Sequence, residues 1–188
     1  MKVGILGVGY VGFPLALQSG KVHETIAYDV NQKRIKDLLL SIDNNNDYDS
    51  SEIEDVVKKN NLKFSSQLSD LKECNFIIVT VPTPVDNNKN PDMSFLESAC
   101  KDISSILNDQ DIVVFESTVY PGAVEEVCIP ILERNSGLIF NKDFYCGYSP
   151  ERVNPGDKVH SIDKIIKVTS GSSPESLKII DDFYKSII

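Results

Sequence analysis

Near its start the chain reads Lys2-Val3-Gly4-Ile5-Leu6 and then Gly7-Val8-Gly9-Tyr10-Val11-Gly12. The first five residues have the apolar character of a buried strand, and the glycines have the spacing of a turn between a strand and a helix. Gly7 permits the tight turn, Gly9 permits backbone N–H groups to approach a pyrophosphate, and Gly12 permits close packing of the helix on the sheet. A diphosphate is then expected at the positive N-terminus of that helix. This stretch predicts a dinucleotide-binding α/β fold.

The next apolar run, Thr25-Ile26-Ala27-Tyr28, ends at Asp29, seventeen residues after Gly12. A carboxylate at that position accepts hydrogen bonds from the ribose hydroxyls of adenosine and repels the 2′-phosphate of NADP. The glycine turn alone would also suit a strand-to-helix connection that binds no ligand. The complete series of strand, turn, helix, strand and acid favours dinucleotide binding, and Asp29 favours NAD as the cofactor.

Apolar runs alternate with amphipathic stretches along the rest of the chain, which is the pattern of a doubly wound, mostly parallel sheet with helices on both faces. We therefore expect a single α/β domain of the Rossmann type. Further strands are predicted over residues 62–65, near an edge of the sheet, and over residues 76–81, 111–115 and 165–168. Two helices are expected to begin with capping boxes, formed by Ser94 with Glu97 and by Ser172 with Glu175.

The composition excludes several classes of function. No apolar run approaches the ~20 residues of a membrane span, so no membrane segment is expected. A net charge of -9 argues against a nucleic-acid partner, which would need a basic surface. Met1 is followed almost directly by a strand, which leaves no room for a cleavable leader, and a cytoplasmic location is expected.

The cysteines and histidines do not suggest a metal site. The cysteines are widely separated, with no Cys-x-x-Cys pair and no neighbouring histidine, at Cys74, Cys100, Cys128 and Cys146. We expect reduced and mostly buried thiols, and no bound metal. His23 and His160 stand in polar contexts and are expected at the surface.

Three motifs in order resemble the UDP-glucose/GDP-mannose dehydrogenase family. They are residues 7–14 (Gly-Val-Gly-Tyr-Val-Gly-Phe-Pro), residues 116–122 (Glu-Ser-Thr-Val-Tyr-Pro-Gly) and residues 148–157 (Tyr-Ser-Pro-Glu-Arg-Val-Asn-Pro-Gly-Asp). The last two are much more specific than the first. The third motif is similar to the branch that acts on UDP-N-acetylhexosamines, because Pro155 stands where UDP-glucose enzymes usually carry a second glutamate.

The resemblance implies an activity and a division of the chain. Family members oxidise the C6 alcohol of a nucleotide sugar to a carboxylate in two NAD-dependent steps, here for surface polysaccharide precursors. The chain covers less than half of the family's usual length, and the family's catalytic cysteine lies in a later domain, so none of the four cysteines takes that role. Residues 1–171 would form the NAD-binding domain, and residues 172–188 would begin a helix that leads to a substrate domain. The full-length protein would be a homodimer with a UDP-sugar substrate.

The resemblance also assigns site residues. Asp29 would hold the adenosine ribose, Arg34 would lie near the adenosine, and Thr83 and Thr118 would line the nicotinamide side. Thr118 and Glu151 would be catalytic, with Glu151 as an acid/base or water-positioning carboxylate. The remaining residues would bind the cofactor at the glycine turn (Gly7, Gly9, Tyr10, Val11 and Gly12) or the sugar nucleotide (Arg152 and Val153).

Simpler interpretations of these residues stay open. Arg34 could be a solvated surface charge, Thr83 and Thr118 could only satisfy backbone groups at strand ends, and Glu151 with Arg152 could be an exposed turn pair.

Other functions also stay open at this point. A stand-alone NAD-binding or regulatory module is one alternative, and a UDP-glucose or GDP-mannose 6-dehydrogenase is another. A short-chain epimerase or reductase is disfavoured because no tyrosine has a lysine four residues later. A β-hydroxyacid dehydrogenase would share the fold but not residues 149–152.

Overall fold

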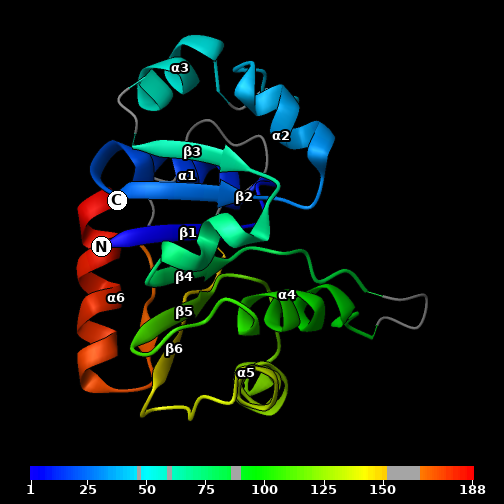
Figure 1. Ribbon diagram of the computed structural model, residues 1–188, viewed down its shortest axis with the longest axis vertical. Helices are drawn as coiled ribbons and strands as arrows, with labels where there is room; N and C mark the ends of the chain where they lie inside the picture. The colour runs from blue at the N-terminus through cyan, green and yellow to red at the C-terminus, as the bar shows by residue number, and fades with distance from the viewer. Residues whose placement is uncertain (46–47, 59–60, 86–89, 152–165) are drawn as a thin grey trace.

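The computed structural model describes residues 1–45, 48–58, 61–85, 90–151 and 166–188. Its centre is one seven-stranded sheet of order β3-β2-β1-β4-β5-β6-β7 (Figure 1). Six strands are parallel and β7 is antiparallel to β6. The expected doubly wound, mostly parallel Rossmann-type sheet is confirmed. The strands are β1 (Lys2–Leu6), β2 (Glu24–Tyr28), β3 (Leu62–Ser65), β4 (Phe76–Val79), β5 (Asp111–Phe115), β6 (Phe144–Tyr148) and β7 (Ser170–Gly171).

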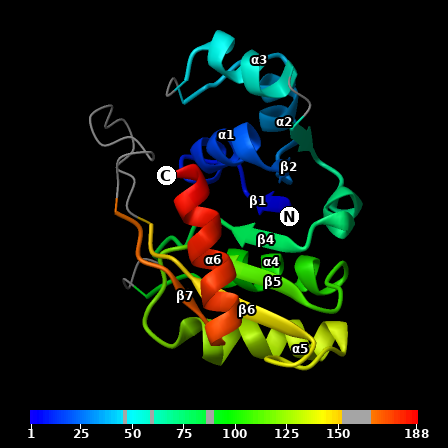
Figure 2. The ribbon, with the colours of Figure 1, turned by 90° about the vertical axis from the view of Figure 1, so that its left-hand side faces the viewer.

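Helices cover both faces of this sheet, as Figure 2 shows for α6, which runs across one face. Side chains of α1 and α6 belong to the core on that face, and side chains of α4 and α5 belong to the core on the other. The helices are α1 (Gly12–Val22), α2 (Gln32–Leu39), α3 (Ser50–Lys58), α4 (Ser94–Ser104), α5 (Ile129–Ser136) and α6 (Pro174–Ile187). A 3₁₀ helix, η1 (Leu68–Glu73), precedes β4, and a π-helix, η2 (Val124–Cys128), leads into α5.

The largest error of the sequence prediction concerns the last strands. The expected strand over residues 165–168 is wrong, because the strand that pairs with β6 is β7, at Ser170–Gly171. Residue 165 lies outside the described residues, and Ile166 is 85% exposed, so this apolar run does not enter the sheet. The strand β6 was not predicted, since its Cys-Gly pair interrupts the β-branched and aromatic pattern of a typical strand. The strand expected over residues 76–81 ends two residues early, at Val79.

Both predicted capping boxes are also wrong. Met93 is the N-cap of α4 and makes no side-chain cap, while Asp92 Oδ1 accepts a hydrogen bond from the Ser94 amide. The capping box of α6 is formed by Ser173 and Ser176, one residue later than expected. Ser172 is instead bound to β6, because its amide donates to the Cys146 carbonyl and its Oγ accepts from the Cys146 amide. Pairing with the sheet therefore decides where α6 begins.

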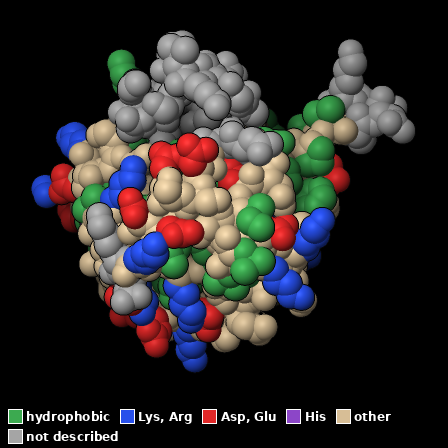
Figure 3. All heavy atoms as spheres, turned by 90° about the horizontal axis from the view of Figure 1, so that it is seen from above, with side chains coloured by type: hydrophobic (Ala, Val, Ile, Leu, Met, Phe, Trp, Pro, Cys, Tyr) green, Lys and Arg blue, Asp and Glu red, His purple; other side chains and the backbone are tan. Residues whose placement is uncertain are grey.

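The surface seen in Figure 3 carries acidic and basic side chains interspersed with one another. All four cysteines are free and buried, as expected. None of the helices in the described part of the chain has the length and apolar character needed to cross a membrane. His23 is half-buried rather than exposed, since its ring packs against Phe183 and its Nε2 lies 2.7 Å from Ser186 Oγ. His160 lies outside the described residues.

Candidate functional site at the carboxyl edge of the sheet

The glycine turn between β1 and α1 has the geometry that its sequence demands. Gly7 has a φ of +100°, a conformation that L side chains rarely adopt. A Cβ at Gly12 would lie 1.9 Å from the Gly7 carbonyl oxygen, so only glycine lets α1 approach the turn. The Thr80 hydroxyl donates to that same oxygen at 2.7 Å. A Cβ at Gly9, in contrast, would meet nothing within 4 Å, and the turn is open on that side.

Asp29 and Arg34 both contact the backbone of Val8, inside this turn. Asp29 Oδ2 accepts a hydrogen bond from the Val8 amide at 2.8 Å, and Arg34 Nε donates to the Val8 carbonyl at 3.0 Å. Arg34 Nη1 also pairs with Asp43 Oδ1 at 2.8 Å, and the guanidinium lies 4.9 Å from the centre of the Phe13 ring. The Arg34 side chain is only 10% exposed, so its interpretation as a solvated surface charge is wrong. Both residues hold the turn in shape.

A cavity of about 340 Å³ opens beside the turn, where β1 separates β2 from β4. Gly7, Gly9 and Asp29 line one side of it, and Thr80, Pro82 and Phe95 are among the residues on the other. In open α/β sheets, ligands bind at the carboxyl ends of strands where the strand order reverses, and this cavity lies at that position. The open side of Gly9, the free space and the carboxylate together fit the adenosine half of a dinucleotide.

The other predicted site residues gather at the ends of β4, β5 and β6. The Thr83 hydroxyl donates to the Thr118 carbonyl, and the Ser117 hydroxyl donates to the Val81 carbonyl at 2.6 Å. Thr83 therefore does satisfy a backbone group at a strand end, as the simpler interpretation held. Glu151 is half-buried and its Oε2 is shielded from solvent, so its interpretation as an exposed side chain is wrong. Arg152 and Val153 lie outside the described residues.

Sequence reasoning missed a buried ionic group beneath these strand ends. Glu116 follows β5 directly and pairs with Lys167 at 2.6 Å, and its other oxygen accepts a hydrogen bond from Tyr184. Burial raises the pKa of Glu116 and of Tyr184. Glu116 is the first residue of the motif over residues 116–122. Its position directly after a fully apolar strand is the signal that could have identified it as a buried charge.

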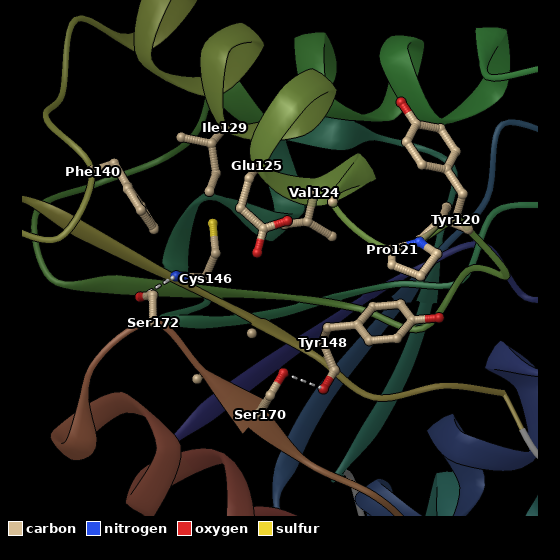
Figure 4. Close-up of a pocket in the computed structure, with 14 residues that line it drawn as sticks. Tyr120, Pro121, Val124, Glu125, Ile129, Phe140, Cys146, Tyr148, Ser170 and Ser172 are labelled. Atoms are coloured by element: carbon tan, nitrogen blue, oxygen red, sulfur yellow. Dashed lines mark hydrogen bonds between the residues drawn. The ribbon is translucent and has the colours of Figure 1, made fainter.

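A second cavity, of about 470 Å³, lies beside β6 and below η2 (Figure 4). Tyr120 and Pro121, which follow Thr118, lie on one side of it, and Phe140 lies on the other. The side chains of Glu125 and Cys146 both extend into this space and lie near one another in Figure 4. Burial raises the pKa of Cys146 well above its usual value, so this thiol is poorly suited to act as a nucleophile.

The strand order, the glycine turn and the cavity with its carboxylate define a dinucleotide-binding domain of the Rossmann type. The family model described as "UDP-glucose/GDP-mannose dehydrogenase family, NAD binding domain" matches residues 1–188. The chain therefore belongs to this family and is its NAD-binding domain.

Relatives with assigned activities match the whole chain. It is 50% identical over 188 residues to the UDP-N-acetyl-D-glucosamine 6-dehydrogenase of Pseudomonas aeruginosa and 49% identical to that of Salmonella typhi. The match covers 100% of this chain and 44% of each relative, so the chain spans less than half of their length.

Solved structures show the same fold. The UDP-D-ManNAc dehydrogenase of Pyrococcus horikoshii superposes with a TM-score of 0.89 at 28% identity, over 100% of this chain and 45% of that one. The GDP-mannose dehydrogenase of Pseudomonas aeruginosa, solved as a ternary complex, superposes with a TM-score of 0.91 at 23% identity, over 100% and 44%. The second likeness concerns the fold alone.

Proposed function

We propose that this chain is the cofactor-binding portion of a nucleotide-sugar 6-dehydrogenase, which oxidises the C6 alcohol of a UDP-N-acetylhexosamine to a carboxylate in two NAD-dependent steps. The observation that carries this proposal is the 50% identity, along the entire chain, to a UDP-N-acetyl-D-glucosamine 6-dehydrogenase. The carboxyl edge of the sheet supports it, because the cavity, Thr118 and the half-buried Glu151 all lie at the ends of neighbouring strands. The product would serve surface polysaccharide synthesis.

The residues around the glycine turn would hold NAD. Backbone N–H groups of Gly9, Tyr10, Val11 and Gly12 would face the diphosphate, and Asp29 would accept hydrogen bonds from the adenosine ribose. Arg34 would act through Val8, whose carbonyl it already binds. Asp29 would also disfavour the 2′-phosphate of NADP. NAD supplies a hydride acceptor when bound, and the protein supplies its orientation.

Thr83 and Thr118 would line the nicotinamide side, and Thr118 and Glu151 would act on the substrate side. Glu151 is suited to position water or move a proton at its carboxylate, because it is partly shielded from solvent. Arg152 and Val153 would contact the sugar nucleotide. Residues 172–188, whose helix α6 packs on the sheet of the NAD-binding domain, would lead toward a substrate domain that supplies the reactive cysteine, in a cytoplasmic homodimer.

Calorimetric titration of the 188-residue chain tests the cofactor assignment. We expect saturable binding of NAD. We expect NADP to bind at least about tenfold more weakly, a difference of about 1.4 kcal/mol, because Asp29 would repel its 2′-phosphate. A folded chain that binds neither, or that prefers NADP, would contradict the proposal.

The substrate assignment is tested on the gene product that includes any coding sequence downstream of Ile188. We expect two NADH formed per UDP-N-acetylglucosamine, and slower turnover of UDP-glucose and GDP-mannose. Preference for UDP-glucose or GDP-mannose, or activity only on a hydroxy acid, would overturn it.

A further inference from the structure

Glu116, Lys167 and Tyr184 form a buried cluster, which we call the ionic cluster. The Lys167 side chain is 4% exposed and the Glu116 side chain 1%. Lys167 Nζ lies 2.6 Å from Glu116 Oε2 and 5.2 Å from the centre of the Tyr184 ring, while the Tyr184 hydroxyl donates to Glu116 Oε1. The three residues come from the end of β5, the segment before β7 and helix α6. The cluster therefore joins parts of the chain that are 51 and 68 residues from Glu116.

Stability alone does not explain such a cluster. Burial removes the lysine and the glutamate from water, which is unfavourable for each ion, and apolar residues of similar volume often give equal or greater stability at such positions. The cluster satisfies its members well, with a charged pair, a hydroxyl donor and an aromatic ring around the ammonium. A buried ion pair specifies one arrangement of the chain, because each charge loses its partner in any other arrangement.

The ionic cluster lies close in sequence and in space to the two candidate catalytic residues, Thr118 and Glu151. Glu116 lies two residues before Thr118, and its backbone amide is bound to the Val79 carbonyl. Lys167 Nζ approaches the carbonyl of Pro150, the residue before Glu151, at 3.5 Å. The Ser149 amide donates to the Phe115 carbonyl at 3.0 Å, so the backbone before Glu151 is tied to the end of β5, while the backbone of Glu116 is tied to β4. The charge of Glu151 is close enough to raise the pKa of Glu116 further.

We propose that Glu116, Lys167 and Tyr184 are positioning residues, which hold Pro150 and thereby the carboxylate of Glu151 in register with the strand end that carries Thr118. This inference rests on the role proposed for Glu151. The ionic cluster acts through the backbone and does not touch the substrate. It also makes α6 part of the site, since Tyr184 closes the cluster from that helix.

The test separates positioning from stability by removing the charges in pairs. The variants Glu116→Gln and Lys167→Met each leave a buried charge without its partner, and we expect both to lower the Tm strongly. The double variant Glu116→Gln/Lys167→Met buries no charge, and we expect it to recover most of the stability. Tyr184→Phe keeps the ring and both charges and removes only the hydroxyl. The matched control is Lys178→Met/Asp182→Asn, which removes an exposed pair on α6.

The readout is local and is made on the 188-residue chain. Amide hydrogen exchange is followed at Ser149 and, as a reference for global opening, at Ile5 in β1. The ¹³C resonance of the Glu151 side-chain carboxyl, assigned with Glu151→Gln, reports its surroundings. In the double variant we expect exchange at Ser149 to be at least about tenfold faster with Ile5 unchanged, together with a displaced Glu151 resonance. We expect Tyr184→Phe to give the same local change with smaller amplitude, and the control to give none.

The inference would be overturned if the folded double variant kept the wild-type exchange rate at Ser149 and the wild-type position of the Glu151 resonance. It would also be overturned if exchange became faster by the same factor at Ser149 and at Ile5. If the double variant does not fold, the same two outcomes in Tyr184→Phe decide. These measurements need no cofactor or substrate. The proposed function is judged separately by NAD binding of the wild-type chain, so the two failures are distinguishable.

Discussion

Asp29 at the end of β2 accepts a hydrogen bond from the amide of Val8, with 2.8 Å between Oδ2 and the nitrogen. The carboxylate therefore shapes the glycine turn while it lines the cavity beside that turn. Asp29 therefore couples the shape of the turn to ligand binding. Loss of its charge would weaken both its hydrogen bond to Val8 and its interaction with a ligand in the cavity.

Asp29→Asn is expected to lower NAD affinity by about 10- to 100-fold, since a hydrogen bond to a charged group contributes about 1.5–3 kcal/mol. The affinity for NADP is expected to fall less, because repulsion of the 2′-phosphate is also removed. Calorimetric titration with both cofactors measures the two changes. Asp55→Asn, at an exposed position of α3, is the control for loss of one negative charge. Equal losses of affinity for both cofactors would contradict the role in selectivity.

Two glycines of the turn are expected to respond in opposite ways to alanine. Gly12→Ala places a Cβ 1.9 Å from a backbone oxygen, and we expect it to prevent stable folding or to cost more than about 4 kcal/mol. Gly9→Ala places its methyl group in open space, and we expect a Tm close to wild type with at least about tenfold weaker NAD binding. Thermal unfolding and calorimetry separate the two effects. Unimpaired NAD binding by Gly9→Ala would place the diphosphate elsewhere.

Arg34→Met is expected to lower the free energy of unfolding by about 3–5 kcal/mol, because it leaves the buried carboxylate of Asp43 without its cationic partner. It also removes the donor to the Val8 carbonyl. Urea unfolding measures the change. Lys33→Met, at the exposed neighbouring position, is the matched control and is expected to change stability by less than about 0.5 kcal/mol. Similar losses in both variants would contradict this role of Arg34.

His23 is expected to make the fold less stable under mildly acidic conditions. Burial is the main cause that lowers the pKa of His23 below its ordinary value of 6.5. The unfolded chain then binds the proton first, so the contribution of His23 to stability is complete above pH 6.5 and is lost as the pH falls toward the lower folded-state value. His23→Gln retains a hydrogen-bonding group for Ser186 and does not titrate. The Tm of the wild type relative to this variant is expected to fall as the pH is lowered below 6.5; a constant difference would contradict the assignment.

The parts of the fold that were predictable from sequence depend on local signals. Gly7 and Gly12 are required by conformation and close contact, and Asp29 follows an apolar strand at the expected distance, so the first half of the sheet could be placed. The cavity beside them follows from the order of the strands. These features need only the residue types and the rules of parallel sheets.

The parts that were missed depend on tertiary contacts. Ile166 and Val168 suggest a strand, but both side chains are exposed. Lys167, between them, is buried instead, because the carboxylate of Glu116 compensates its positive charge. Arg34 could have been a surface charge or a neighbour of adenosine, and its burial follows from Asp43 and the Val8 carbonyl, which bind it. The partners of Arg34 and Lys167 lie 9 to 51 residues away in the sequence. Contacts at such separations do not follow the period of a helix or a strand, so no pattern in the sequence indicates them.

The buried state of all four cysteines makes the chain a convenient background for site-specific labelling. A cysteine introduced at the exposed Tyr10, in Tyr10→Cys, would be the one accessible thiol of this 188-residue chain, directly on the glycine turn. An environment-sensitive fluorophore attached there would report cofactor arrival in real time. The same labelling at Val30, which lines the cavity, would distinguish filling of the adenosine side from events at the far strand ends.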